Sequence, residues 1–570
     1  MVEAPETRPV RTRTLTSLVP AAVRAYGVQV AVRAPWRGEL ESVSYAELDR
    51  RSAEARDVLR TMVSAQDHVV ISGANSIPWI VAFFGVIRAG AIPVPLDPGL
   101  DADRRDAILA EVRPVAILAD RRVLQGLGRT SASRFELGSA MGSTSTHDPT
   151  ATADAEPDED DVAVLIHTTG TTGAPKGVML THRNLVVEME AVVAASRPAM
   201  DDALFLTLPL YHAFALTVGL LSPIAAGVPV DLEPRLTHIG RRLTESHPTI
   251  IVGVPALFEV LVREVRRRAK GPRRLYLRAA LATNRALIVL AGVNAGRFLL
   301  RPVRAALGGR LRFAVSGGAP LAVETIRQAH ALGIPLLQGY GLTEAGPVVS
   351  VQRFSSRRFW WSRYYWRRAG SLGPPVPCCT VRIEAVPGLD APDGEIVVSG
   401  DNVMAGYFRN EALTRETLRA GSLFTGDIGH VDGDGELHVT GRLKLAVSTP
   451  SGKLVHLERV EAAIGAAPEV EQIRVVDEPG PPWRLVAIVY PSVIADSGGT
   501  ADAATMLANV RRAVAIAERT LLSYERVAEV RLADAPLPLT PLGKLRRGAP
   551  PSLAFDIERW RTSIRQRKVE

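Results

Sequence analysis

The sequence predicts an α/β protein with one large and one small domain. Short apolar runs alternate with helical patterns from about residue 15 to 130 and again from about 180 to 350, which is typical of parallel strands joined by helices. From about 370 to 440 the pattern changes to short β segments. A chain of 570 residues also exceeds one ordinary domain. We therefore expect an N-terminal domain over 1–441, with two α/β subdomains and a β subdomain, and a small C-terminal α+β domain over 442–570.

The first α/β stretch contains clear elements. We expect helices over 46–62 and 77–89 and strands over 68–72 and 91–95. Residues 131–161 are polar, small and acidic, which predicts a surface loop. That loop leads into a buried strand over 162–167.

The second stretch begins with a helix after Thr181. Its expected strands are 204–208, 250–254 and 311–315, followed by β segments over 380–384, 394–399 and 436–440. In the small domain we expect helices over 457–466 and 501–522 around a strand over 485–490.

Residues 203–230 carry no formal charge and resemble a membrane span in composition. Pro209, Pro223 and Pro229 divide them, and His212 lies among them. A buried helix flanked by strands and loops is the better interpretation.

Bulk composition excludes several protein classes. The only cysteines, Cys378 and Cys379, are too few for a disulfide scaffold or a four-ligand zinc site, which fits a reducing cytoplasm. The N-terminus lacks the apolar stretch of a signal peptide. The net charge is +8, but zinc-finger spacing, basic-zipper heptads and RNA-binding aromatic motifs are absent. We therefore expect a cytoplasmic protein without a nucleic-acid partner.

Lysine is rare in this arginine-rich chain. It occurs only at positions 176, 270, 444, 453, 544 and 568. A compact ammonium differs from a planar guanidinium in what it contacts. Four of the six lysines fall inside the motifs described next, which points to selected roles.

A hydroxyl-rich loop follows the strand over 162–167. Residues 167–177 read His-Thr-Thr-Gly-Thr-Thr-Gly-Ala-Pro-Lys-Gly, with four threonines and three glycines around Lys176. Glycines allow backbone N–H groups to converge on an anion. The chain has no Walker loop, because neither Gly-Lys pair is followed by Ser or Thr. The loop predicts a phosphate site made of Thr168, Thr169, Gly170, Thr171, Thr172, Gly173 and Lys176.

This segment resembles the signature loop of the adenylate-forming superfamily, which includes acyl-CoA synthetases, peptide-synthetase adenylation domains and luciferases. The family has Ser where this chain has Thr169, so the hydroxyl is kept. The resemblance implies that the loop holds the β- and γ-phosphates of ATP. It covers roughly residues 40 to 547 through an ordered series of motifs.

Three further motifs resemble the nucleotide site of that family. In Gln338-Gly339-Tyr340-Gly341-Leu342-Thr343-Glu344, the resemblance makes Glu344 a ligand of Mg²⁺, a cation that prefers oxygen, and lets Thr343 donate to the α-phosphate. Tyr340 and Gly317, Gly318, Ala319 and Pro320 resemble the adenine slot. Asp427, in Thr425-Gly-Asp, resembles the ribose site, since one carboxylate can accept from both vicinal hydroxyls. The family usually has Trp at the position of Ser422.

The C-terminal motifs imply a domain that moves. Gly441-Arg-Leu-Lys444 resembles the interdomain hinge, with Arg442 reaching phosphate or ribose and Lys444 at the pivot, although Leu445 replaces the usual acid. Ser451-Gly452-Lys453 resembles the loop that faces coenzyme A. Lys544, in residues 537–546, matches the catalytic lysine, whose charge assists departure of pyrophosphate. His212, after Leu208-Pro-Leu-Tyr, resembles a residue of the acyl pocket, and a plain core histidine is an equal alternative.

The resemblance implies ATP-dependent activation of a carboxylic acid to acyl-AMP, followed by transfer to coenzyme A. Residues 316–321 and 300–312 look most like medium- and long-chain fatty acyl-CoA synthetases. Two alternatives stay open: a fatty acyl-AMP ligase that loads a carrier protein, and a degenerate homologue that binds nucleotide without catalysis. The expected ligands are the acid, ATP, Mg²⁺ and coenzyme A.

Two basic regions suggest contact with a membrane surface. Residues 262–304 are rich in arginine with apolar residues between, and residues 353–368 interleave arginines with aromatic rings. Such mixtures suit an interface between lipid and water. A solvated helix face together with a partner or core contact is the alternative, so peripheral contact at the inner membrane surface is a hypothesis.

Overall fold

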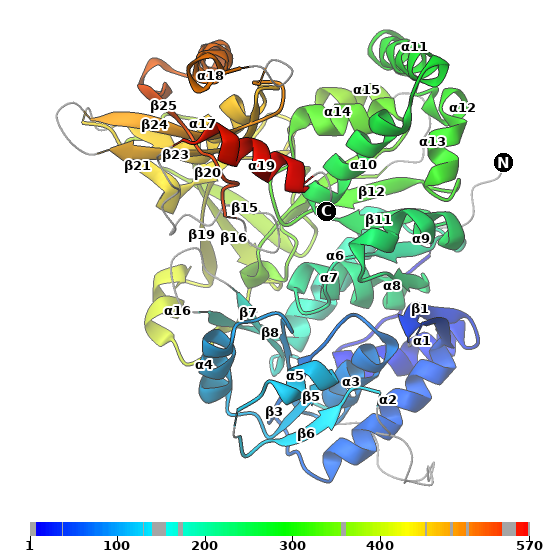
Figure 1. The fold of residues 1–570 in the computed structure, drawn as a ribbon. Helices are drawn as coiled ribbons and strands as arrows, with labels where there is room; N and C mark the ends of the chain where they lie inside the picture. The colour runs from blue at the N-terminus through cyan, green and yellow to red at the C-terminus, as the bar shows by residue number, and fades with distance from the viewer. Residues whose placement is uncertain are drawn as a thin grey trace. The chain divides into compact units, whose positions relative to one another are not determined.

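The computed structural model describes residues 7–36, 38–128, 130–138, 156–168, 175–354, 361–450, 453–478, 483–496, 501–538 and 555–567. The chain forms two compact units (Figure 1). Unit 1 comprises Met1–Val381 and Val398–Leu423, and unit 2 comprises Arg382–Val397 and Phe424–Glu570. Each unit buries its own apolar core.

The unit boundaries fall inside strands of one sheet. That five-stranded sheet has the order β15-β16-β19-β18, with β20 paired to β19. Its strands are β15 (Cys379–Glu384), β16 (Gly394–Gly400), β18 (Leu418–Arg419), β19 (Ser422–Val431) and β20 (Leu437–Arg442). The compact units thus divide before Arg442. The predicted domain boundary at 441/442 was placed at the hinge motif, where the C-terminal domain is expected to pivot. This boundary stays a prediction.

A four-stranded parallel sheet begins unit 1, in the order β4-β3-β5-β6. Its strands are β3 (His68–Ser72), β4 (Ile92–Leu96), β5 (Ala116–Ala119) and β6 (Ser133–Glu136). The surrounding helices are α2 (Tyr45–Arg60), α3 (Ile77–Arg88), α4 (Ala102–Val112) and α5 (Arg121–Gln125). Helix α3 is buried almost all round, and Ser76 caps it by accepting from Trp79 N–H.

Strand β6 corrects the expectation of a loop from 131 to 161. Residues 133–136 pair with β5 in parallel register. Ser-Arg-Phe-Glu has no apolar run, so its strand character comes from ladder hydrogen bonds at the sheet edge.

An eight-stranded sheet forms the second α/β part of unit 1. Its order is β14-β13-β12-β11-β9-β10-β1-β2. The strands are β1 (Val30–Trp36), β2 (Glu39–Ser44), β9 (Leu204–Leu206), β10 (Val230–Leu232), β11 (Ile250–Gly253), β12 (Phe313–Ser316), β13 (Leu336–Tyr340) and β14 (Ser350–Val351). Strands β1 and β9 to β13 run parallel. The α/β alternation expected here is therefore present.

Helices pack around this sheet (Figure 1). They are α1 (Leu18–Tyr26), α7 (Ala213–Leu216), α8 (Ser222–Ala226), α9 (Ile239–Ser246), α10 (Pro255–Arg268), α11 (Pro272–Ala286), α12 (Gly296–Leu299), α13 (Arg301–Ala306), α14 (Val323–Ala331) and α15 (Trp361–Arg367). Short 3-10 helices are η1 (Leu15–Ser17), η3 (Leu236–His238) and η5 (Thr343–Ala345), and short π-helices are η2 (Thr217–Leu221) and η4 (Leu287–Ala291). The apolar core between them includes Phe205, Ile251, Ala314 and Leu336.

The uncharged segment 203–230 forms β9, the buried run α7–η2–α8 and β10. This matches the expected buried helix flanked by strands. Within the described residues, no helix is both long and apolar enough to cross a membrane.

A small three-stranded sheet, in the order β17-β8-β7, connects distant parts of unit 1. It consists of β7 (Val162–Thr168), β8 (Lys176–Thr181) and β17 (Gly406–Tyr407). Helix α6 (His182–Ser196) follows β8 directly, and Thr181 and Asn184 form a reciprocal cap at its start. Helix α16 (Glu411–Thr417) follows β17.

Unit 2 ends in a three-stranded sheet, in the order β23-β24-β25, covered by helices. Strands β21 and β22 form a separate two-stranded sheet. The elements of this part of unit 2 are η6 (Leu443–Leu445), β21 (Ala446–Ser448), β22 (Leu454–His456), α17 (Leu457–Gly465), β23 (Val470–Glu478), β24 (Arg484–Pro491), α18 (Ala503–Ala517), η7 (Glu518–Thr520), η8 (Ser523–Glu525), β25 (Glu529–Leu532) and α19 (Ile557–Arg567).

Helix α18 is shorter than the predicted helix over 501–522. Asp502 caps its start by accepting from Thr505 N–H. At the other end, α18 stops at Ala517, the turn η7 follows with Leu521 N–H donating to Glu518 O, and the backbone of Leu521 is extended.

Candidate active site

The carboxyl ends of the parallel strands bring three predicted segments to one edge of the eight-stranded sheet. Gly253 pairs with Ser316 at the ends of β11 and β12, and Ser316 pairs with Gln338 in β13. Segments that leave parallel strands at the same edge meet there. Residues 207–212, 317–320 and 341–344 therefore lie around one edge of unit 1.

Two glycines of these segments are held in tight packing. A side chain at Gly317 would place its Cβ 2.8 Å from the Phe214 ring, so the predicted adenine-slot turn lies against the helix that follows His212. At Gly341, a Cβ would lie 1.9 Å from the Pro347 carbonyl oxygen. Only glycine fits this position, just before Thr343 and Glu344. Gly318 has a φ of +80°, which also favours glycine.

Tyr407 connects the end of the phosphate loop to the predicted metal ligand. Its hydroxyl donates to Glu344 Oε1 at 2.9 Å, and Lys176 Nζ lies 5.5 Å from the centre of its ring. Burial, then the charge of Glu344, raises the pKa of Tyr407, so the phenol stays a hydrogen-bond donor. An ammonium, a phenol and a carboxylate are thus brought together from β8, β17 and η5.

The backbone explains why these groups meet. Tyr407 pairs with Val178 across β17 and β8, and Ala405 N–H donates to Met179 O at 3.0 Å. Met404 N–H donates to Glu344 O, also at 3.0 Å. The segment 404–407 therefore lies between the strand that carries Lys176 and the turn that carries Glu344.

Glu188 on α6 supports the same turn from inside the protein. It is fully buried, and its carboxyl accepts from Val348 N–H at 2.8 Å. Asn402 Nδ2 donates to Glu188 at 3.2 Å and to the Ala345 carbonyl at 3.1 Å. Burial raises the pKa of Glu188 to about 8. Neither Glu188 nor Tyr407 lies in one of the motifs predicted from the sequence, so neither was among the predicted site residues.

The other residues of the predicted adenine and magnesium motif lie at the end of β13 and in the turn that follows it. Gly339 and Tyr340 pair with Val351 and Ser350 at the end of β13. Gln338 is buried, and its side chain donates to the Ala369 carbonyl at 2.9 Å, so its side chain stabilises the sheet edge. Thr343 and Glu344 are half-buried, which leaves part of each surface open.

His212 lies in a segment fixed by the first sheet. Asn75 donates to Leu208 O at 2.7 Å and accepts from Leu210 N–H at 2.8 Å. The His212 and Tyr211 rings lie 4.6 Å apart. Burial, then Asp97, raises the pKa of Tyr211, which is hydrogen-bonded to Asp97.

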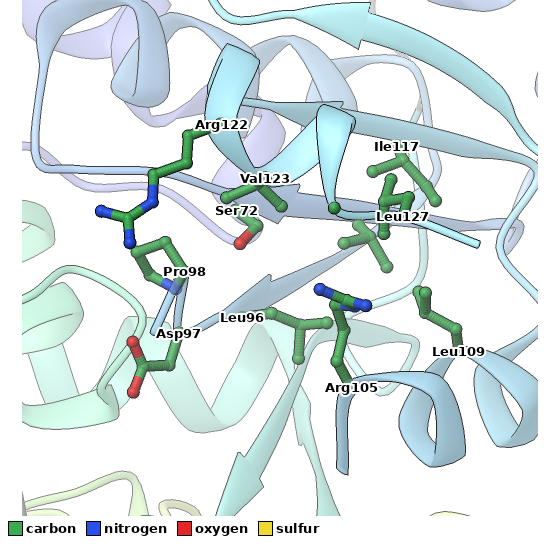
Figure 2. Close-up of a pocket in the computed structure, with 12 residues that line it drawn as sticks. Ser72, Leu96, Asp97, Pro98, Arg105, Leu109, Ile117, Arg122, Val123 and Leu127 are labelled. Atoms are coloured by element: carbon green, nitrogen blue, oxygen red, sulfur yellow. The ribbon is translucent and has the colours of Figure 1, made fainter. Parts of the chain in front are cut away.

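A cavity of about 210 Å³ lies beside Asp97, at the carboxyl ends of β3 and β4. Figure 2 shows Arg105 and Arg122 among apolar side chains that line it. Among the predicted site residues that the structure describes, none lines this cavity.

In unit 2, the predicted ribose residue is paired with an arginine. Asp427 and Arg442 face each other across β19 and β20, and Arg442 Nε lies 3.0 Å from Asp427 Oδ1. Asp427 is buried, and Arg442 is half-buried. Near the end of unit 1, Ser422, where the family has Trp, shares a 2.8 Å hydrogen bond with Ser399.

The predicted hinge and coenzyme A loop are described in part. Lys444 is exposed in η6. Lys453 Nζ lies 2.8 Å from Asp390, and this hydrogen bond raises the pKa of Lys453. Seven predicted site residues lie outside the described residues: Thr169, Gly170, Thr171, Thr172, Gly173, Gly452 and Lys544.

The donor set around Glu344 suits a hard cation. In the described part of the chain, no three His, Cys, Asp or Glu side chains gather as a metal site. Mg²⁺ is commonly held by one or two carboxylates together with phosphate and water oxygens. The half-buried Glu344 carboxylate fits that mode of binding.

The chain is similar in sequence to a known protein family and to several characterised enzymes. The family model of the AMP-binding enzyme matches residues 19–408. A long-chain-fatty-acid–CoA ligase of Mycobacterium bovis, FadD15, is 29% identical over 561 residues, covering 89% of this chain and 90% of the relative. A feruloyl-CoA synthase of an Amycolatopsis species is 29% identical over 523 residues, covering 89% and 93%.

Solved structures show the same fold. ATP-bound MatB from Rhodopseudomonas palustris has a TM-score of 0.74 at 24% identity, covering 94% of this chain and 98% of its own. MenE from Bacillus subtilis, in complex with an acyl-adenylate intermediate, has a TM-score of 0.71 at 21% identity, covering 93% and 97%. These likenesses confirm the predicted α/β fold class over nearly the whole chain.

Proposed function

The chain belongs to the AMP-binding enzyme family and is an AMP-forming acid–CoA ligase, and on this premise we propose that its acid is a medium- or long-chain fatty acid. The observation that best supports ATP binding is the arrangement of Lys176, Tyr407 and Glu344 in unit 1. An ammonium that can bind phosphate lies over the ring of one tyrosine, and a carboxylate that can bind its metal accepts from the hydroxyl of the same tyrosine.

The first half-reaction forms acyl-AMP. An oxygen of the acid attacks the α-phosphorus of ATP, the bond from that phosphorus to the bridging oxygen breaks, and pyrophosphate leaves. Lys176 and the hydroxyls of its loop bind the β- and γ-phosphates, Thr343 donates to the α-phosphate, and Asp427 accepts from the ribose. Positioned charge is the main catalytic device in such transfers.

Glu344 would hold Mg²⁺, which supplies charge neutralisation on the phosphates. The Tyr407 hydroxyl orients the Glu344 carboxylate by donating to Oε1. The backbone of Gly341 packs against Pro347 O, which would lie 1.9 Å from a Cβ there, so the turn that leads to Glu344 is held in place. Lys544 assists departure of pyrophosphate in this proposal.

The second half-reaction transfers the acyl group. The thiolate of coenzyme A attacks the acyl carbonyl, the bond from carbon to the AMP oxygen breaks, and AMP leaves. We propose that the C-terminal domain pivots at Lys444 between the two steps, so that Lys544 leaves the site and the loop of Gly452 and Lys453 faces the thiol.

Two relatives of equal identity support different acids. FadD15 is named for long-chain fatty acids, and the Amycolatopsis relative is named for ferulate. The resemblance of residues 300–312 and 316–321 favours the fatty acid. An aromatic acid is the second candidate, because the feruloyl-CoA synthase covers the chain equally well.

The test is acid-dependent release of pyrophosphate over a panel that includes acetate, decanoate, palmitate and ferulate. Each acid is assayed with and without coenzyme A, and with a carrier protein bearing phosphopantetheine. The proposal predicts the highest kcat/KM for decanoate or palmitate, with thioester formed on coenzyme A.

Other results select the alternatives. Preference for ferulate establishes the aromatic acid. Thioester formed only on the carrier protein establishes a fatty acyl-AMP ligase, and absence of pyrophosphate release with every acid establishes a degenerate homologue.

A further inference from the structure

The positive charge of the protein is concentrated in one region of unit 1. Residues 255–306, which span α10 to α13, contain twelve Lys and Arg but only two Glu. Their net charge is therefore +10, while the whole chain carries +8. The rest of the chain sums to −2, although residues 353–368 form a second basic segment, so this helical region carries the largest part of the positive charge.

Helix α11 and its continuation η4 have two apolar faces. One face is buried: Leu277 and Ala280 belong to an apolar core of unit 1, and Ile288 is buried as well. A helix at the surface of a protein normally turns polar residues to the other side. In this helix the opposite side carries a second apolar stripe.

The outward stripe follows helical spacing. Leu275, Ala279, Ala282, Ala286 and Leu290 are separated by three or four residues, which places them on one side of a helix. All five are exposed, and the exposed fractions of Leu275 and Leu290 are 72% and 76%. Large apolar side chains at regular spacing in solvent indicate an interaction surface.

Neighbouring elements extend this surface. The Tyr276 hydroxyl donates to Leu299 O of α12 at 2.6 Å, so α11 and α12 lie side by side (Figure 1). Phe298 of α12 is 57% exposed and Tyr276 is 56% exposed. Apolar and aromatic groups thus continue from the stripe onto the adjacent helix.

Arginines border the stripe. Arg274, Arg278 and Arg285 follow one another at intervals of four and seven residues and are exposed. By helical spacing they lie along one flank of Leu275, Ala282 and Val289. Arg285 also lies 5.3 Å from the Trp366 ring of α15. An exposed apolar stripe with arginines along its edge is the pattern of a helix that lies in a lipid–water interface.

We propose that α11, η4 and α12 form a docking surface for an anionic membrane. The stripe from Leu275 to Leu290, with Phe298, enters the headgroup region, and the flanking arginines pair with lipid phosphates. A second copy of this chain fits poorly, because it would bring two arginine-bordered surfaces of the same charge sign together. A nucleic acid would use the arginines but leave the apolar stripe in water.

This proposal does not depend on which acid the enzyme activates. Its test is flotation of the full chain with vesicles of phosphatidylcholine and phosphatidylglycerol in equal parts, compared with vesicles of phosphatidylcholine alone. Wild type is expected to float with the anionic vesicles at physiological salt, and less at high salt, because screening weakens the attraction.

Two double variants separate the contributions of charge and apolar contact. Arg274→Gln with Arg278→Gln is expected to lower the partition coefficient roughly fivefold per arginine removed. Leu275→Ser with Leu290→Ser is expected to lower it about tenfold, because exposed apolar surface no longer enters the lipid. Arg415→Gln and Ile516→Ser are matched controls at exposed positions outside these three elements, and they are expected to float like wild type.

All variants are first shown to release pyrophosphate with a soluble acid at the wild-type rate, which establishes that they fold. Failure of the wild type to float, or unchanged flotation of both double variants, overturns the proposal. Sedimentation velocity and a gel shift with duplex DNA cover the other partners. Self-association, or DNA binding without vesicle binding, abolished by the same substitutions also overturns it.

Discussion

The Tyr407 hydroxyl donates to Glu344 Oε1 at 2.9 Å across 63 residues of sequence, and the same ring lies 5.5 Å from Lys176 Nζ. A tyrosine outside every recognised motif thus lies between two motif residues. Partners that orient a metal ligand are often as important as the ligand itself. We infer that Tyr407 positions Glu344 for the metal bound to ATP.

Tyr407→Phe removes that donor while keeping the ring beside Lys176. We expect the Mg²⁺ concentration for half-maximal pyrophosphate release to rise about 10–100-fold, because the carboxylate loses its orienting partner. Magnesium titration at saturating ATP measures this. Tyr26→Phe, at another hydrogen-bonded tyrosine of unit 1, is the control, and an unaltered magnesium titration of Tyr407→Phe would remove the positioning role.

Gly341→Ala tests the tight turn before Glu344. The new Cβ would lie 1.9 Å from Pro347 O, so the turn must shift. We expect loss of pyrophosphate release and a fall of about 1–3 kcal/mol in the free energy of unfolding, measured by urea denaturation. Gly240→Ala is the control, since its Cβ would meet nothing within 4 Å. Wild-type activity in Gly341→Ala would show that the turn tolerates displacement.

Glu188→Gln tests the buried carboxyl beneath the same turn. Burial raises the pKa of Glu188 from 4.5 to about 8, so the folded protein holds a proton that the unfolded chain releases between these values. Stability contributed by this group is therefore lost as pH rises from about 5 to 8, at up to roughly 1.4 kcal/mol per pH unit.

The variant cannot release that proton, so we expect its free energy of unfolding to fall less steeply with pH than that of wild type. Urea denaturation from pH 5 to 8 measures the difference. Glu190→Gln, two residues along α6, is the matched control. Parallel pH profiles for wild type and Glu188→Gln would contradict a raised pKa at this site.

Asp427→Ala tests the ribose role. If the carboxylate accepts from the ribose hydroxyls, wild type uses ATP much better than 2′-deoxy-ATP, and the variant loses about tenfold or more of that preference. The ratio of kcat/KM for the two nucleotides is the readout. Asp393→Ala, which removes a partner of Thr440 and His430 on the same sheet, serves as the control. An unchanged ratio in Asp427→Ala would place the ribose elsewhere.

Local sequence patterns predicted much of the fold. The strand over 68–72 matches β3 residue for residue, because a short apolar run is decisive where both faces of a sheet are buried. The edge strand β6 was missed, since Ser-Arg-Phe-Glu carries no such pattern. The end of α18 was placed too late, because Leu521 and Leu522 fit a helical apolar pattern but adopt extended backbone after the turn η7.

The candidate site also contains residues that the sequence predicted and residues that it did not. Motif residues such as Lys176, Glu344 and Asp427 were found because their residue types and spacing resemble a family pattern. Tyr407 and Glu188 act through partners 63 and 160 residues away. No local pattern reports such contacts, so only the three-dimensional structure identifies them.

The most direct test of the two-step account is Lys544→Ala, assayed separately in each half-reaction. The account predicts that acid-dependent pyrophosphate release falls about a hundredfold or more, while thiolysis of preformed acyl-AMP by coenzyme A stays near the wild-type rate. Equal loss in both half-reactions would contradict it, because a lysine that leaves the site before thiolysis has no part in the second step.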